Sequence, residues 1–181
     1  MKALAAAALL ALVIACGQGR AIFNVDVLSF IQPSGKDTIP YTLPTSVITI
    51  SADSFITPQK VSLPSGLGNS SVDSVSLTGA AEAINQTGTG SVKFELFFSK
   101  DSASVYSGTP YITATGTIST QPDTVQLLPA TTVSLADSIF NTNTLWVGFH
   151  AAMTQNAGPG LSGKVRLTLV NLRIVLQDKV F

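Results

Sequence analysis

The sequence predicts an all-β protein, an antiparallel β-sandwich of about ten strands with either a jelly-roll or an immunoglobulin-like topology. Three observations lead to this fold class. Apolar and polar residues alternate in many short segments, which is the period of a half-buried strand. Clusters of Gly, Pro, Asn and Ser interrupt these segments about every ten residues. No segment carries the period of a long amphipathic helix.

In the first half of the chain, we expect strands at Ile22–Ile31, Tyr41–Ser51, Ser54–Leu63 and Val72–Thr78. Leu28 and Phe30 break the alternation of the first segment, which indicates a bulge. Pro44 and Pro58 favour an edge position or an interruption, because proline cannot donate a hydrogen bond to a neighbouring strand. Gly79–Asn85 fits either a helical turn or a continued strand.

In the second half, Ser91–Ser99 has the clearest strand pattern. Large apolar side chains share one face there, and charged side chains the other: Val92, Phe94, Leu96 and Phe98 against Lys93 and Glu95. Further strands are expected at Tyr111–Ile118, Val125–Leu128, Thr132–Leu135 and Thr144–Met153. Between the last two, Ala136–Asn143 is expected to hold one helical turn, which Asp137 or Ser138 is able to cap.

Gly163–Gln177 is expected to be the longest strand. Its apolar residues change parity near Val170–Asn171, so we predict a bulge or a bend between the two sheets there. The polar segments between the strands are expected to be loops: Gln32–Asp37, Pro64–Ser71, Gln86–Gly90, Lys100–Pro110 and Thr154–Ser162.

The first sixteen residues have the pattern of a secretory leader. Lys2 precedes thirteen uninterrupted apolar residues, Ala3–Ala15, a run that is too short to span a bilayer as a helix. The run ends in Val13-Ile14-Ala15-Cys16, which resembles the lipobox of bacterial lipoproteins. This resemblance implies cleavage before Cys16 and attachment of lipid, including palmitate, to that residue.

The leader divides the chain into a signal peptide at 1–15, a lipidated tether at 16–21 and one β-sandwich domain at 22–181. The resemblance implies a bacterial envelope lipoprotein held in the membrane by its N-terminal lipid, since two or more acyl chains anchor a protein stably. Gly17 follows the cysteine where an Asp would favour retention in the inner membrane. The expected location is therefore the outer membrane, if the cell has one.

The composition excludes several classes of function. Lys and Arg number ten, Asp and Glu also number ten, and the basic residues form no cluster. The chain therefore lacks the electrostatic pattern of a nucleic-acid binder. Cys16 is the single cysteine, so no intramolecular disulfide forms. With one histidine and one cysteine, a zinc-type site lacks ligands, and no cofactor is expected.

His150 is the single histidine, so a Ser-His-Asp or Cys-His mechanism would have to use it. It lies within a predicted strand, and the more ordinary interpretation is a histidine on a strand face. The ten carboxylates are dispersed, and no two of them mark a paired acid–base site. We therefore expect no enzymatic activity, with a carboxylate-based hydrolase as the less favoured alternative.

The expected function is that of a binding or structural module with a protein or glycan partner in the envelope. Trp146, Tyr106 and Tyr111, together with Tyr41, are the residues from which an aromatic platform for sugar rings would be built. Trp146 has the opposite parity to Leu145 and Val147, so it lies on the other face of its strand. If that face is solvated, Trp146 indicates binding; the more ordinary interpretation is that it covers the sheet or packs under a loop. A carbohydrate-binding domain is therefore the alternative to a protein-binding module. Loops on a rigid sandwich are the other expected contact regions.

Overall fold

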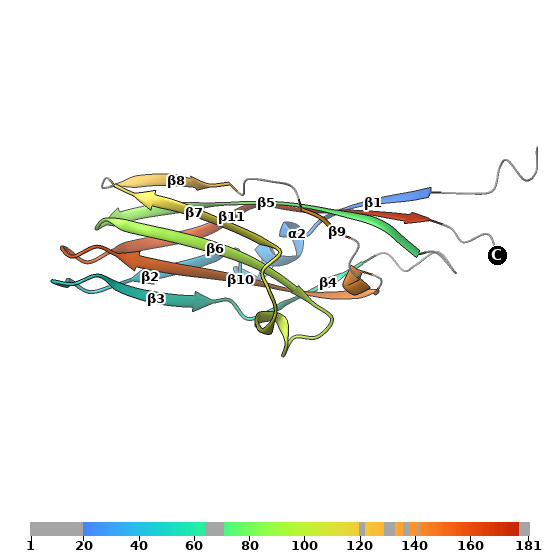
Figure 1. Cartoon of the computed structure of the whole chain (residues 1–181), viewed down its shortest axis with the longest axis horizontal. Coiled ribbons are helices and arrows are strands. Elements are labelled where there is room, and N and C mark those ends of the chain that lie inside the picture. The colour runs from blue at the N-terminus through green and yellow to red at the C-terminus, as the bar shows by residue number, and fades with distance from the viewer. Residues whose placement is uncertain are drawn as a thin grey trace, which may run out of the picture.

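A computed structural model describes residues 20–63, 71–119, 122–128, 133–135, 138–140 and 142–177. It confirms the predicted fold class: within these residues, eleven strands form two antiparallel sheets that pack face to face (Figure 1). Cys16 and residues 64–70 of the predicted loop Pro64–Ser71 lie outside the described residues, and Ser71 already belongs to a strand.

The larger sheet has six strands built around β11. On one side β11 pairs with β5 along its whole length, and on the other side it pairs with β1 and β2, which lie end to end. The far edge of β5 carries β8 and β9, also end to end. The strands of this sheet are β1 (Arg20–Asp26), β2 (Thr38–Thr42), β5 (Ser71–Thr87), β8 (Asp123–Leu127), β9 (Val133–Leu135) and β11 (Ser162–Gln177).

The smaller sheet has five strands built around β10. One side of β10 pairs with β6, which pairs in turn with β7, and the other side pairs with β3 and β4, again end to end. The strands of this sheet are β3 (Ile50–Phe55), β4 (Gln59–Ser62), β6 (Gly90–Ser99), β7 (Ile112–Ile118) and β10 (Thr144–Gln155).

The connections decide between the two predicted topologies. When each end-to-end pair is taken as one interrupted strand, the chain has eight strands in two four-stranded sheets. In chain order, their arrangement is 1-8-3-6 in the larger sheet and 2-7-4-5 in the smaller one. This order is that of a jelly roll, in which the chain repeatedly crosses from one sheet to the other.

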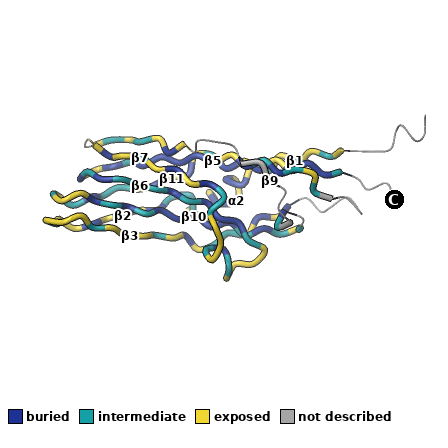
Figure 2. Tube along the Cα trace, viewed as in Figure 1, coloured by how far each residue is buried: buried dark blue, intermediate teal, exposed yellow. Residues whose placement is uncertain are grey.

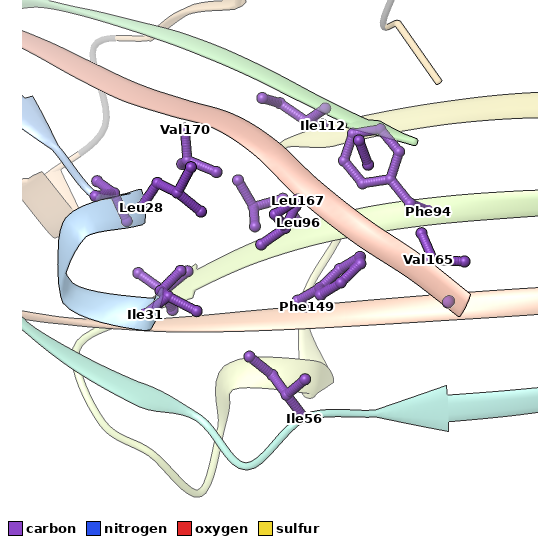
Figure 3. Close-up of a cluster of buried hydrophobic side chains, with 14 of the residues drawn as sticks. Leu28, Ile31, Ile56, Phe94, Leu96, Ile112, Phe149, Val165, Leu167 and Val170 are labelled. Atoms are coloured by element: carbon purple, nitrogen blue, oxygen red, sulfur yellow. The ribbon is translucent and has the colours of Figure 1, made fainter. Parts of the chain in front are cut away.

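The core fills the space between the sheets. The inward residues of β10 are buried (Figure 2). Phe94 and Leu96 of β6 belong to the same interior cluster as Leu167 and Val170 of β11 (Figure 3). This arrangement confirms the inward faces that alternation predicts for β6 and β10, whose buried members include Val92, Phe94, Leu96, Phe98, Leu145, Val147, Phe149 and Ala151.

The first predicted strand is shorter than expected. The tether prediction reached residue 21, but β1 begins at Arg20 and ends at Asp26. A short helix, α2 (Leu28–Ile31), follows and continues into the 3-10 turn η1 (Gln32–Ser34). The break in alternation thus marks a helical turn rather than a bulge, because Leu28 and Ile31 are both buried between the sheets at helical spacing. Within the described residues, no helix is long and apolar enough to span a membrane.

Two more boundaries differ from the prediction. Residues 43–49 leave the larger sheet and cross to the smaller one, so the expected single strand Tyr41–Ser51 is wrong across Pro44. The ambiguous segment Gly79–Asn85 is strand, which makes β5 seventeen residues long, one more than β11. The expected helical turn within Ala136–Asn143 is present as the 3-10 turn η3 (Ser138–Phe140).

The expectation that Gly163–Gln177 is the longest strand is wrong, because β5 has 17 residues and β11 has 16. The predicted irregularity of this C-terminal segment is confirmed. The register of β11 against β5 shifts between Leu167 and Leu169, slightly before the predicted position. Val165 and Leu167 are buried before the shift, and Val170 and Leu172 after it. The bulge therefore lets both halves of β11 face the core despite their opposite parity.

Candidate binding face around His150 and Phe55

The solvent side of the five-stranded sheet, called here the front face, gathers the polar and aromatic groups of most chemical interest. Outward positions alternate with core positions along β3, β6 and β10. Cross-strand register then places His150 of β10 opposite Glu95 of β6 and Phe55 of β3. The front face is defined by these three residues together with Asp53 and Lys93.

His150 lies between two carboxylates. Its Nδ1 is 2.7 Å from Oε2 of Glu95, and its Nε2 is 3.0 Å from Oδ1 of Asp53. The histidine is 7% exposed, whereas the Asp53 side chain is 61% exposed. Both ring nitrogens thus lie within hydrogen-bond distance of a carboxylate oxygen. The ring therefore connects the largely buried Glu95 to the exposed Asp53.

Glu95 is also held by Lys93, whose Nζ lies 2.9 Å from Oε1 of the carboxylate. Burial tends to raise the pKa of Glu95, but the hydrogen bonds and charges of Lys93 and His150 outweigh burial and lower it. The carboxylate is thus ionised at neutral pH and lies beside the Lys93 ammonium. The result is a hydrogen-bonded network that is largely buried at Glu95 and open to solvent at Asp53.

Phe55 is the exposed aromatic residue of this face. Its ring stacks on the imidazole of His150, with a centroid distance of 4.1 Å and an interplanar angle of 12°. Its edge meets Tyr106 at a centroid distance of 4.9 Å. Phe55 nevertheless remains 53% exposed. An apolar ring is therefore fixed in orientation and presented to solvent beside charged groups.

Tyr106 packs beside Phe55 on the same side of the sheet. It lies in the 3-10 turn η2 (Val105–Ser107), which folds over Gly148 so closely that a Cβ there would stand 2.6 Å from the tyrosine ring. The Tyr106 hydroxyl donates to the carbonyls of Ile56 and Phe149, at 2.7 and 3.2 Å. Burial raises the pKa of this hydroxyl to about 12, against a smaller lowering from its bond to Phe149. The Tyr106 hydroxyl is thus engaged in hydrogen bonds within the fold.

The four aromatic residues predicted as a platform do not gather in one place. Trp146 is half-buried on the outer side of β10, as its parity predicts. Tyr111 instead packs against the core beside Phe98 and Phe140, with centroid distances of 5.7 and 5.9 Å.

The expectation for Tyr41 is wrong. It is 4% exposed, and its hydroxyl donates to Oδ1 of Asn85 at 3.3 Å. Burial raises the pKa of this hydroxyl to about 12. Sequence reasoning also missed Phe55. The outward parity of Phe55 with Asp53 on the proline-flanked segment was the available signal.

The geometry offers little for acid–base catalysis at His150. Both ring nitrogens already face carboxylates. A nucleophile needs a free nitrogen on its base within hydrogen-bond reach. In the part of the chain that the structure describes, no three His, Cys, Asp or Glu residues are placed to hold a metal ion. The arrangement is suited to recognition by an aromatic ring and flanking polar groups.

The predicted contact loops have different structural roles. Within Lys100–Pro110, the turn η2 packs on the front face over Gly148 and contacts Phe55 through Tyr106. The loop predicted at Thr154–Ser162 spans residues 156–161 and is tied to the β2–β3 connection by paired backbone bonds between Ser46 and Gly158. Buried Gln155 adds hydrogen bonds to Pro44 and Leu161. This loop is therefore part of a rigid end of the sandwich.

Comparison with known proteins gives no family. No protein-family model matches the chain, and no curated protein matches it. Among solved structures, a chain from the structure of infectious bursal disease virus strain Gx is 12% identical, with a TM-score of 0.35, over 91% of this chain and 39% of the viral chain. Strain Gt gives 10% identity and a TM-score of 0.38, over 90% of this chain and 37% of its own. The chain thus spans well under half of these viral proteins.

A further solved structure, TmCBM61 in complex with beta-1,4-galactotriose, is 13% identical with a TM-score of 0.33. The match covers 84% of this chain and 88% of that one.

Proposed function

We propose that this protein is a non-catalytic recognition module, attached to a membrane through lipid on Cys16, that binds carbohydrate on its front face. One observation carries the proposal. Phe55 is 53% exposed, yet its ring is fixed by stacking on His150 and by a T-shaped contact with Tyr106. A rigid exposed aromatic ring loses little conformational entropy when a ligand packs against it.

The groups around Phe55 favour a sugar as the ligand. A sugar ring presents an apolar C–H face and a rim of hydroxyl groups, so it needs an aromatic surface with hydrogen-bonding groups beside it. On the front face, Asp53 supplies an exposed acceptor, and Lys93, 41% exposed, supplies a donor. The outward positions of β7 add the exposed threonines Thr113, Thr115 and Thr117.

The proposed attachment rests on the leader that ends in Ala15-Cys16. Strand β1 begins at Arg20, so only a few residues separate the proposed lipid from the folded domain. A lipidated chain of this kind would hold the sandwich close to the membrane surface of a bacterial envelope. A module so placed would serve to retain a glycan, or a partner that carries one, at that surface.

The binding proposal is tested by affinity electrophoresis of a soluble chain from residue 20 onward in gels that contain galactan, xylan or dextran. At least one polysaccharide is expected to retard the protein, and Phe55→Ala is expected to remove the retardation. Phe30→Ala is the matched control, because Phe30 is also an exposed phenylalanine, 41% exposed, but lies on α2 outside the front face.

Retardation by none of the three polysaccharides, or equal loss with both variants, would contradict the proposal. The proposal that the module is non-catalytic is tested by a separate measurement. Release of reducing ends from the bound polysaccharide, abolished by Glu95→Gln without loss of folding, would show a carboxylate-based hydrolase instead.

A further inference from the structure

The opposite side of the sandwich carries a second polar site, on the solvent side of the six-stranded sheet. There a groove of about 380 Å³ lies over β1, β11 and β5, three neighbouring strands in Figure 1. We propose that this groove binds a small carboxylate-bearing sugar, with Arg173 holding the carboxylate. This site is separate from the proposed front-face site and does not depend on it.

The groove is built as a regular grid of polar side chains. Three strands each contribute two outward residues in register. The first row contains Asn24, Arg173 and Ser76, and the second contains Asp26, Asn171 and Thr78. Strand spacing and pleat give this grid a footprint of roughly 10 by 7 Å, which is close to one sugar ring with its substituents. The amide, hydroxyl and carboxylate groups of the grid match a ligand with many hydroxyls.

Arg173 gives the groove its charge preference. The structure describes all three arginines of the chain, and the other two are paired: Arg20 with Asp73, and Arg166 with Glu82. Arg173 has no carboxylate within salt-bridge distance among the described residues, although Asp26 lines the same groove. An exposed, unpaired guanidinium is suited to bind a carboxylate through two parallel N–H donors.

Asp26 already accepts hydrogen bonds within the fold, so we assign it a secondary role in ligand binding. Its Oδ1 accepts a long bond from the Ser29 backbone N–H at 3.4 Å, and its carbonyl accepts from the Ser29 hydroxyl at 2.7 Å. It is therefore held at the rim of the groove, where a carboxylate accepts hydrogen bonds from sugar hydroxyls. The arrangement would repel a ligand of high negative charge and accept a single carboxylate on a neutral ring.

The probe is glucuronate, with glucose as its neutral counterpart, titrated into nitrogen-15-labelled protein and followed by NMR. The side-chain amide signals of Asn24 and Asn171 are expected to shift with glucuronate, and less with glucose. Arg173→Gln is expected to weaken glucuronate binding at least about tenfold, because it removes a charge-assisted pair.

The matched control is Lys164→Gln, which removes one positive charge from the same exposed side of β11 but does not line the groove. It is expected to leave glucuronate binding unchanged. Equal weakening by both variants would show general charge attraction, and no shift of the asparagine signals in the unmodified protein would show that the groove binds no such sugar. Either outcome overturns the proposal, and neither bears on Phe55.

Discussion

At the scale of single residues, His150 acts as a bridge between two strands. It connects Glu95 of β6 to Asp53 of β3 and carries the ring of Phe55 on its own ring. Glu95 is the more buried partner, with its side chain 13% exposed, and its carboxylate is stabilised by Lys93 and His150 beside it. The residue that presents Phe55 to solvent is thus itself held in place by hydrogen bonds to two carboxylates.

This network predicts a pH dependence of stability. The pKa of Glu95 is lowered in the folded state, because its bonds to Lys93 and His150 outweigh burial. The carboxylate therefore stabilises the fold above its unfolded pKa, near 4.3, and this stabilisation is lost as pH falls through the lower folded pKa. Glu95→Gln should cost about 1.5–3 kcal/mol at pH 7, the range for hydrogen bonds to charged groups.

Urea unfolding of the two proteins between pH 7 and pH 3 measures this effect. The difference in their free energies of unfolding should shrink as the solution is acidified. Lys93→Met, which removes one donor to the same carboxylate, should give a smaller loss with the same trend. A difference that persists unchanged at pH 3 would show that Glu95 does not act through its charge.

Part of this site is readable from sequence, and part is not. The alternation in Leu145–Ala151 places His150 on the outer side of its strand, as the structure shows. Its two partners, however, lie 55 and 97 residues away in the chain. Which carboxylates reach the ring depends on the register of β10 against β6 and β3, and strand register is set by tertiary packing.

At the scale of elements, the turn η2 fixes the front face. It folds back over β10 at Gly148, where the absence of a side chain leaves room for Val105 and Tyr106. Phe55 and Phe97 hold the Tyr106 ring from two sides, with centroid distances of 4.9 and 5.4 Å. If Gly148 gained a side chain, the turn would have to move away from β10, and this movement would disturb the ring contacts of Tyr106 and cost free energy.

Gly148→Ala is accordingly expected to destabilise the protein by about 1–3 kcal/mol, the usual cost of overpacking. The new Cβ would stand 2.4 Å from Cγ1 of Val105, which is 1% exposed and has no room to move. Gly108→Ala is the control, because Gly108 has nothing within 4 Å and an ordinary φ of −97°. Chemical denaturation of both variants measures their free energies of unfolding. A Gly148→Ala protein as stable as the control would mean that η2 packs loosely.

Element boundaries show what sequence patterns miss. Leu28 and Phe30 change the parity of the first segment, and the same change fits a bulge or a helical turn when read alone. The structure selects the helical turn, because Leu28 and Ile31 then both enter the core below β11. In contrast, the parity change in Gly163–Gln177 is flanked by apolar residues on both sides, and it is indeed a bulge.

At the scale of the whole molecule, β11 gives the sandwich a long axis. Its first residue, Ser162, pairs with Thr42, and its last, Gln177, pairs with Arg20. The N-terminal end of β1 and the β2–β3 connection therefore lie at opposite ends of the domain, as Figure 1 shows. Sixteen strand residues separate them, or about 50 Å at 3.3 Å per residue.

Attachment at Cys16 would orient this axis relative to the membrane. The Arg20 end would lie at the bilayer surface, and the β2–β3 connection would point away from it. That connection exposes Val47 and Ile48, 93% and 66% exposed, on a loop braced by the Ser46–Gly158 bridge. The front face and the β1–β11–β5 groove would both stand along the sides of the axis, accessible from the solvent.

The orientation is testable by fluorescence transfer from a dye on the protein to acceptor lipids in vesicles that contain the lipidated protein. Because Cys16 is the single cysteine and is proposed to be blocked by lipid, an introduced thiol becomes the unique labelling site. A dye on Ile22→Cys, 52% exposed in β1, should transfer strongly, and a dye on Val47→Cys should transfer weakly across about 50 Å. Cys16→Ser should abolish both palmitate labelling and vesicle attachment. Palmitate labelling that survives this substitution would contradict the proposed lipid attachment at Cys16. Equal transfer from the two dyes would show that the domain lies flat on the membrane or moves freely on its tether.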